Sequence, residues 1–271
     1  IQGRSQVFNG NLQLTLSYIA VEKGPIDPAR FLPHGDKHVP TMEVELKRII
    51  SDLRNPWLRR LNEAFFVRDQ EFARAFALAP AAKAMHHAWL GGLLEHTLGV
   101  ARLALKICPL YPQLDADLVL SGALLHDIGK VEELVYERSF DYSTPGRLLG
   151  HISLGVRMIH ERAAAIKGFP AELLLLLEHL ILSHHGEYEY GSPKRPKTLE
   201  ALLLNFIDDL DAKLVGVETI IKGAGSGQTW TDFHRLFGRP FFVGFPEPAP
   251  APESAEPAPA ALPPDDSPRL F

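Results

Sequence analysis

Histidine and aspartate residues recur in segments that otherwise have the apolar character of buried helices. The clearest case is LLHDIGK, residues 124–130, where His126 and Asp127 end an apolar run that begins at Leu118. Four other segments share this character: GGLLEHT with His96, LLGHIS with His151, LILSHHGEY with His184 and His185, and LNFIDDLDAK with Asp208. Polar and charged side chains are seldom buried unless they are paired or bind a metal ion. The fold must therefore provide partners for side chains from five helical segments.

One shared metal site would satisfy all five segments together. A single histidine of this kind is more often a satisfied core residue or a surface residue, but separate burial of so many polar groups would be unfavourable. Imidazole and carboxylate groups suit divalent transition metals such as Mn, Fe, Co, Ni or Zn. The remaining histidines lack this context as a set and are expected to be structural or exposed: His34, His38, His86, His87, His160, His179 and His234. Of these, His86 and His87 have the best case for a site role, because they precede the helix of His96.

The central part of the sequence has a helical pattern. Thr41 followed by apolar positions from Val44 to Ile50 predicts a capped amphipathic helix. Asn55-Pro56 predicts a second helix, with Asn as its cap and Pro at its first position. Further helices are expected at about residues 91–107, 115–129, 148–166, 171–183 and 197–222. Because no second set of alternating strands is seen, we expect residues 41–243 to form an all-α body.

Three regions flank this body. In residues 1–24, Leu12, Leu14 and Leu16 alternate with polar residues, which predicts a half-buried strand, and Asn9-Gly10 predicts a tight hairpin turn. A hairpin alone is marginal in water, so we expect it to belong to a larger sheet, and we expect a chain that begins at Ile1 to be incomplete at its N-terminus. Residues 25–40, rich in Pro and Gly, are expected to be a linker, and the Pro/Ala/acid-rich residues 244–271 a disordered tail.

Composition excludes intrachain disulfides and membrane-spanning segments but leaves most function classes open. The single cysteine, Cys108, excludes intrachain disulfides, as is usual in a reducing compartment. No apolar stretch is long enough to span a bilayer and no signal peptide precedes the first element, so a cytoplasmic protein without membrane association is expected. The net charge is −5, of which −4 falls in residues 244–271. The nearly neutral body neither requires nor excludes a polyanionic ligand, and a nucleic acid would need a local basic patch.

The ordered pattern H…HD…H…HH…D resembles that of the HD-domain superfamily of metal-dependent phosphohydrolases. Over about residues 80–215, the sequence more specifically resembles bacterial YhaM-type 3′→5′ exoribonucleases. The segments that carry this resemblance are HHAWLGGLLEHTLGVARLA, LLHDIGKVEEL, GHISLG, LILSHHGEYEYGSPK and IDDLDAK. In that family an OB-fold precedes the HD domain, and the text GNLQLTL is similar to the later part of that fold. The resemblance implies a mainly α fold: an all-α HD-domain helical bundle after a partial OB-like β segment. The Pro/Ala tail is not part of the family pattern.

The resemblance also implies a ligand set. His96, His126, Asp127 and Asp208 match the main metal ligands of the family, and His151, His184 and His185 match positions that hold a second ion, with Asp127 between the two. We therefore expect two divalent ions, with Mn²⁺ favoured and Fe²⁺, Co²⁺, Ni²⁺ or Zn²⁺ as alternatives. Asp208 rather than its neighbour Asp209 matches the family position, and Asp211 would support it from the same helical face.

Other residues are candidates for contact with substrate. Lys130 follows Asp127 by three positions, and we expect it to contact the scissile phosphate; a solvated lysine at a helix end is the alternative. Lys194, Arg195 and Tyr188 are candidate substrate-binding residues, with Tyr190 as a second aromatic face, although basic residues in a Pro-rich loop are often only solvated.

Three functions fit the sequence. The first, implied by the resemblance, is a metal-dependent 3′→5′ exoribonuclease that acts on single-stranded RNA, with single-stranded DNA and homo-oligomer formation left open. The second is an HD phosphohydrolase of small nucleotides or cyclic dinucleotides, which would not need strand-guiding OB-like strands. The third is an RNA-binding scaffold with an inactive HD site, although every ligand position is filled.

Overall fold

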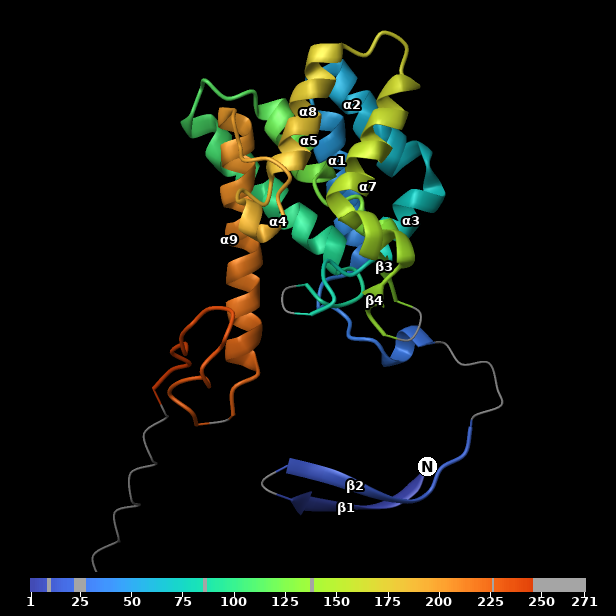
Figure 1. Ribbon diagram of the computed structural model, residues 1–271, viewed down its shortest axis with the longest axis vertical. Helices are drawn as coiled ribbons and strands as arrows, with labels where there is room; N and C mark the ends of the chain where they lie inside the picture. Colours follow the sequence, from blue (N-terminus) through green and yellow to red (C-terminus); the bar gives the residue numbers. More distant parts are fainter. Residues whose placement is uncertain (9–10, 22–27, 85–86, 137–138, 226, 246–271) are drawn as a thin grey trace, which may run out of the picture. The chain divides into compact units, whose positions relative to one another are not determined.

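The computed structural model describes residues 1–245 except residues 9–10, 22–27, 85–86, 137–138 and 226 (Figure 1). The predicted turn at Asn9-Gly10, His86 and the predicted tail from residue 246 onward lie outside the described residues. The chain divides into two compact units, Ile1–Gly216 and Val217–Phe271. All candidate site residues lie in the first unit. The body that we predicted over residues 41–243 crosses this division, and its limits remain a prediction.

The fold is mainly helical, as the sequence predicted. The helices are α1 (Val39–Asp52), α2 (Pro56–Glu63), α3 (Gln70–Leu78), α4 (Gly92–Ile107), α5 (Ala116–Leu125), α6 (Lys130–Glu133), α7 (Thr144–Ala164), α8 (Ala171–Ser183) and α9 (Leu199–Lys222). Short 3₁₀ or π segments are Pro28–Phe31, Ala64–Arg68, Cys108–Leu110 and Tyr188–Tyr190. The strands are β1 (Gln2–Phe8), β2 (Asn11–Tyr18), β3 (Leu134–Val135) and β4 (Asp141–Tyr142). The pair β3–β4 was not predicted, because two-residue strands have no detectable period.

The core of the bundle is centred on α4 and α5. Helix α5 has the sequence ADLVLSGALL and is buried from Leu118 to Leu125, as expected for a helix that is apolar on every side. It packs against α2, α4 and α8, and α7 packs against α8 (Figure 1). Because α5 is enclosed, the residues that follow it emerge inside the bundle. This burial carries His126 and Asp127 to the centre of the molecule.

The helix starts were predicted with mixed success. The Asn55 side chain accepts hydrogen bonds from the amides of Trp57 and Leu58, which confirms it as the cap of α2. The prediction for Thr41 was wrong: α1 begins at Val39, and Pro40 occupies its first turn, so Thr41 already lies within the helix. Helix α3 was missed, although Asp69 accepts from the amide of Phe72 as a regular N-cap.

The predicted hairpin is present, since β1 pairs with β2 in antiparallel register from Gln2–Tyr18 to Phe8–Asn11. The leucines at 12, 14 and 16 are exposed by 74%, 67% and 46%, so the expected half-burial is absent. Alternation predicts which residues share a face of a strand, but burial also needs a layer that covers this face. In the described part of the chain, no helix is both long and apolar enough to cross a membrane.

Candidate metal centre

The candidate site begins with the turn that follows α5. His126 is the C-terminal cap residue of α5, and its Nδ1 donates to the carbonyl of Ala123 at 2.9 Å. Two residues after Asp127, Gly129 allows α7 to approach closely: a Cβ at this position would lie 2.0 Å from the carbonyl oxygen of His151. Within α7, Gly150 has φ +72°, which bends the helix immediately before His151. The turn and the bent helix thus bring His151 towards Asp127.

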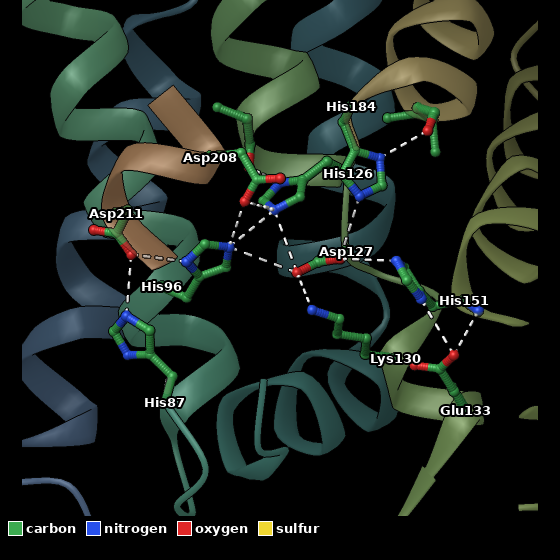
Figure 2. Close-up of polar contacts among 12 residues, drawn as sticks. His87, His96, His126, Asp127, Lys130, Glu133, His151, His184, Asp208 and Asp211 are labelled. Atoms are coloured by element: carbon green, nitrogen blue, oxygen red, sulfur yellow. Dashed lines mark hydrogen bonds and ion pairs between the residues drawn. The ribbon is translucent and has the colours of Figure 1, made fainter. Parts of the chain in front are cut away.

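The predicted ligands come together from α4, the turn after α5, α7, the end of α8 and α9, with Asp127 between the others. Figure 2 shows all of them except His185. On one side of Asp127, Oδ2 lies 3.3 Å from His126 Nε2 and 3.6 Å from His96 Nε2. Asp208 Oδ1 lies 3.1 Å from His96 Nε2 and 3.7 Å from His126 Nε2. These four residues present donor atoms to one small volume.

A second group of donors lies on the other side of Asp127. Its Oδ1 atom is 3.4 Å from His151 Nε2 and 3.8 Å from His184 Nε2. Ligand atoms of His151, His184 and His185 lie within 4.8 Å of one another. The two oxygens of Asp127 therefore face two different sets of imidazoles, which is the arrangement expected of a carboxylate between two ions.

Hydrogen bonds at Nδ1 fix the imidazoles so that Nε2 faces the centre. His126, His184 and His185 donate from Nδ1 to the backbone carbonyls of Ala123, Ile181 and Tyr190 at 2.9, 2.7 and 2.9 Å. His96 and His151 donate in the same way to Asp211 at 2.7 Å and Glu133 at 3.2 Å. These acceptors hold no proton of their own, so each Nδ1 carries a proton and Nε2 is the nitrogen that remains for an ion. Metal-binding histidines are oriented by this kind of partner.

Some of the candidate ligand atoms are not satisfied by hydrogen bonds, and a divalent cation would satisfy them. Asp127 Oδ1, His151 Nε2 and His184 Nε2 are buried and make no hydrogen bond within the described structure. Unsatisfied buried polar atoms are rare and destabilising. In addition, His96 Nε2 and His126 Nε2 face each other at 3.2 Å. Nitrogen and oxygen atoms that converge in this way repel one another unless a proton or a metal cation lies between them, and imidazole with carboxylate suits a transition metal.

The comparisons with known proteins agree with this geometry. Residues 93–213, which contain His96, His126, Asp127, His151, His184 and Asp208, match the HD domain family. The chain contains an HD domain, over residues 93–213. A second family, described as a putative helicase, matches residues 46–117. No solved structure matches the chain.

Two curated relatives of this HD-domain protein carry the name 3′-5′ exoribonuclease YhaM. The protein of Bacillus pumilus (strain SAFR-032) is 39% identical over 197 residues, which are 73% of this chain and 62% of the relative. The protein of Bacillus velezensis (strain DSM 23117 / BGSC 10A6 / LMG 26770 / FZB42) is 39% identical over 193 residues, 71% of this chain and 60% of the relative. The chain thus spans about three fifths of the length of these relatives.

The surroundings of the HD site hold Asp127 and His184 in the deprotonated forms that bind a metal ion, whereas His96 keeps a proton. Burial would raise the pKa of Asp127, but Lys130 and His126 outweigh it and hold this pKa well below its usual range. Burial lowers the pKa of His184 well below its ordinary value, and His185 adds to this effect. For His96, burial acts in the same direction, but hydrogen bonds to Asp208 and Asp211 raise its pKa to about 9. A proton on His96 therefore balances the carboxylates until a cation does so.

Two residues at the HD site were not predicted as part of it. His87 was expected to be structural or exposed; it is buried, and its Nε2 donates to Asp211 Oδ2 at 3.0 Å, which agrees with a structural residue and places it next to the candidate ligands. Its φ of +49° is unusual for a residue other than glycine. Glu133 accepts from both the amide (2.9 Å) and Nδ1 of His151. The proximity of His87 to the GGLLEHT segment was a usable signal, whereas Glu133 had none.

Beside the ligands is a cavity of about 210 Å³, lined by His96, Asp127, Lys130, His184, His185, Tyr190, Asn205, Asp208, Asp209 and Ala212. Lys130 is 8% exposed, and its Nζ lies 2.6 Å from Asp127 Oδ2, which excludes the solvated alternative. Of the aromatic candidates, Tyr190 lines the cavity and Tyr188 does not. Arg195 pairs with Glu187 at 2.7 Å, and Lys194 is exposed, so neither reaches the cavity lining. Their role in substrate binding stays a prediction.

Proposed function

We propose that this chain is the catalytic part of a metal-dependent 3′→5′ exoribonuclease that hydrolyses phosphodiester bonds of single-stranded RNA. The observation that carries the proposal is Asp127, whose two oxygens face two separate groups of histidine Nε2 atoms. The relatives that share this HD domain are named exoribonucleases. Since the chain spans only part of their length, the activity is proposed from the site and the resemblance together.

In this proposal, His96, His126, Asp127 and Asp208 hold one ion, and His151, His184 and His185 hold a second ion together with Asp127. Bound divalent ions, with Mn²⁺ favoured, would supply Lewis acidity and lower the pKa of a water for attack on phosphorus. The Nδ1 hydrogen bonds keep each imidazole oriented without a conformational change. This preorganisation is supported by the fact that Ala123 and Ile181 are buried residues of α5 and α8, the helices that end at His126 and His184.

Lys130 supplies a positive charge at the same place. It is buried, its pKa is raised because Asp127 outweighs the effect of burial, and it lines the cavity. We propose that its ammonium group contacts the scissile phosphate and stabilises the charge that develops on the phosphate oxygens. The cavity lies below the roughly 300–1,000 Å³ of pockets for drug-sized ligands, which suits the end of one strand.

The outer parts of the chain have proposed roles of their own. We propose that residues 1–24, which include the β1–β2 hairpin, are the part of an OB-like module that guides single-stranded RNA. Residues 25–40 would link it to an HD domain over residues 41–243, and residues 244–271 would form a tail without a catalytic role.

The decisive experiment follows the shortening of 5′-labelled RNA with a free or a blocked 3′ end, with and without Mn²⁺. The proposal expects a ladder that shortens from the free 3′ end only, and only with metal. As a control, the Asp208→Asn variant should give no ladder. Equal treatment of both RNAs contradicts an exonuclease that starts at the 3′ end. Hydrolysis of mononucleotides or cyclic dinucleotides in place of RNA would support the small-nucleotide phosphohydrolase.

A further inference from the structure

The loop that follows α8 brings an aromatic side chain to the cavity. Residues 186–195 connect the histidine pair at 184–185 to the region before α9, and Tyr188–Tyr190 form one 3₁₀ turn within this loop. Tyr190 lines the cavity together with His185 and Asn205, and the residue is 70% exposed. A large, solvent-accessible aromatic ring at the edge of a site for phosphodiester chemistry is a candidate for contact with a nucleobase.

The loop is held firmly enough to place this ring. Gly186, the first residue of the loop, has φ +79°, and a Cβ here would lie 2.5 Å from Asn205 Nδ2. The start of the loop therefore packs tightly against α9. Near its end, the Ser192 hydroxyl donates to the carbonyls of Leu182 and Lys194 at 3.2 and 2.7 Å. The amide of Tyr190 donates to the carbonyl of Glu187 at 3.1 Å. The backbone of Tyr190 is thus restrained before any ligand binds.

Tyr190 is also tied directly to the candidate metal site. Its carbonyl oxygen accepts from His185 Nδ1 at 2.9 Å, which is the bond that directs His185 Nε2 towards the centre. One residue therefore holds a candidate ligand with its backbone and also lines the cavity.

The neighbouring Tyr188 offers a contrast within the same turn. Its ring is covered by Arg195, whose guanidinium carbon lies 5.1 Å from the ring centroid, and Arg195 is fixed by its ion pair with Glu187. Tyr188 does not line the cavity. No described aromatic ring or cation packs against Tyr190 in this way. Of two tyrosines two positions apart, one is engaged within the loop and the other is presented to a ligand.

We infer that Tyr190 stacks on the base of the 3′-terminal nucleotide and so positions the last phosphodiester bond at the ions. This inference rests on the proposed function, and it names the group that recognises the end of the strand. Stacking on an aromatic ring tolerates every base, because each base has a π face. The recognition would therefore depend on the presence of a terminal base and not on its identity.

The experiment compares the wild-type protein with Tyr190→Ala, Tyr190→Phe and the matched control Tyr188→Ala. The substrates are two RNAs that differ only in whether the 3′-terminal nucleotide carries a base or is abasic. We expect Tyr190→Ala to raise KM for the normal RNA about tenfold and to abolish the preference for a terminal base. Tyr190→Phe, which retains the ring, should behave like the wild type, and Tyr188→Ala should keep the preference for a terminal base whatever its KM. Loss of this preference in both alanine variants, or its persistence in Tyr190→Ala, would overturn the inference.

A binding measurement separates this inference from the proposed function. Fluorescence anisotropy with a 5′-labelled RNA whose last linkage is a non-hydrolysable methylenephosphonate gives Kd in the presence of Mn²⁺ without turnover. A Kd weakened about tenfold in Tyr190→Ala and restored in Tyr190→Phe supports the stacking contact even if the wild-type protein does not shorten RNA. An unchanged Kd in Tyr190→Ala rejects the contact even if the wild-type protein is an active exonuclease.

Discussion

Asp211 connects a buried histidine to a candidate metal ligand, because its Oδ2 atom accepts from His87 Nε2 at 3.0 Å and from His96 Nδ1 at 2.7 Å. Asp211 itself is held deprotonated: burial would raise its pKa, but the hydrogen bonds from His87 and His96 keep it low. His87 thus supports the orientation of His96 through Asp211 on α9, and the centroids of the two imidazole rings lie 5.3 Å apart.

We predict that His87→Ala weakens the affinity for the ion held by His96 by about 10- to 100-fold, the usual effect of removing a partner that orients a metal ligand. Isothermal titration with Mn²⁺ measures this affinity. His87→Gln, which can still donate to Asp211, should recover part of it. The matched control is His160→Ala, because His160 is 66% exposed in its side chain and pairs with Glu178. An unchanged affinity in His87→Ala with normal folding would show that the contact has no positioning role.

Because two groups of donor atoms surround Asp127, we predict that single substitutions remove one of the two metal ions and leave the other bound. The wild-type protein should bind two Mn²⁺ ions, His126→Ala should lose mainly the first and His151→Ala mainly the second, because these histidines face different oxygens of Asp127. Asp127→Asn should weaken both. Metal content after gel filtration, measured by mass spectrometry, tests this. Retention of two tightly bound ions by Asp127→Asn would contradict a shared carboxylate.

Lys130 should affect turnover more than metal binding. We expect Lys130→Ala to lower kcat by about 10²-fold, because the variant loses a preorganised positive charge beside the reacting phosphate. Metal content should be measured in parallel, since Lys130 also contacts Asp127 Oδ2. Lys106→Ala, which removes an exposed lysine from the end of α4, serves as the control. Full turnover in Lys130→Ala would remove this residue from the mechanism.

The close approach of α7 to the turn after α5 predicts different effects of two glycine substitutions. Gly129→Ala places a methyl group against the backbone of His151 and should destabilise the fold by about 1–3 kcal/mol. Gly155→Ala, on the facing helix, meets its nearest atoms only at 3.6 Å and should leave stability unchanged or slightly higher. Urea denaturation of the two variants measures both effects. Equal stabilities would show that the backbones are not in tight contact.

The sequence predicted the inner part of the site because its members share one signal, a polar residue in an apolar helix. His126, His184 and Asp208 lie in segments that have to be buried, and burial at one centre follows from their number. The position of His87 could not be predicted in this way, since it lies in an irregular segment and its partner Asp211 is 124 residues away. Glu133 depends on the bend at Gly150, which no local pattern indicates.

The same limit applies to the fold. Long helices with buried faces, such as α4 and α8, were predicted with nearly correct ends, because periodicity extends over several turns. The start of α1 was placed too late, because a capping residue type is a weaker signal than the preference of Pro40 for the first turn. The exposure of Leu12, Leu14 and Leu16 depends on the arrangement of a sheet, which alternation alone does not describe.

The ligands are distributed over most of the helical bundle, from His96 on α4 to Asp208 on α9. During synthesis, the ribosome must therefore release α9 before the first ion can be held by its full set of side chains. A nascent or truncated chain that ends before α9 would keep most of the histidines but lack Asp208 and Asp211. If the proposed exoribonuclease activity is correct, hydrolysis of RNA would begin only after α9 has joined the bundle, and an incomplete chain would be inactive towards the RNA from which it is translated.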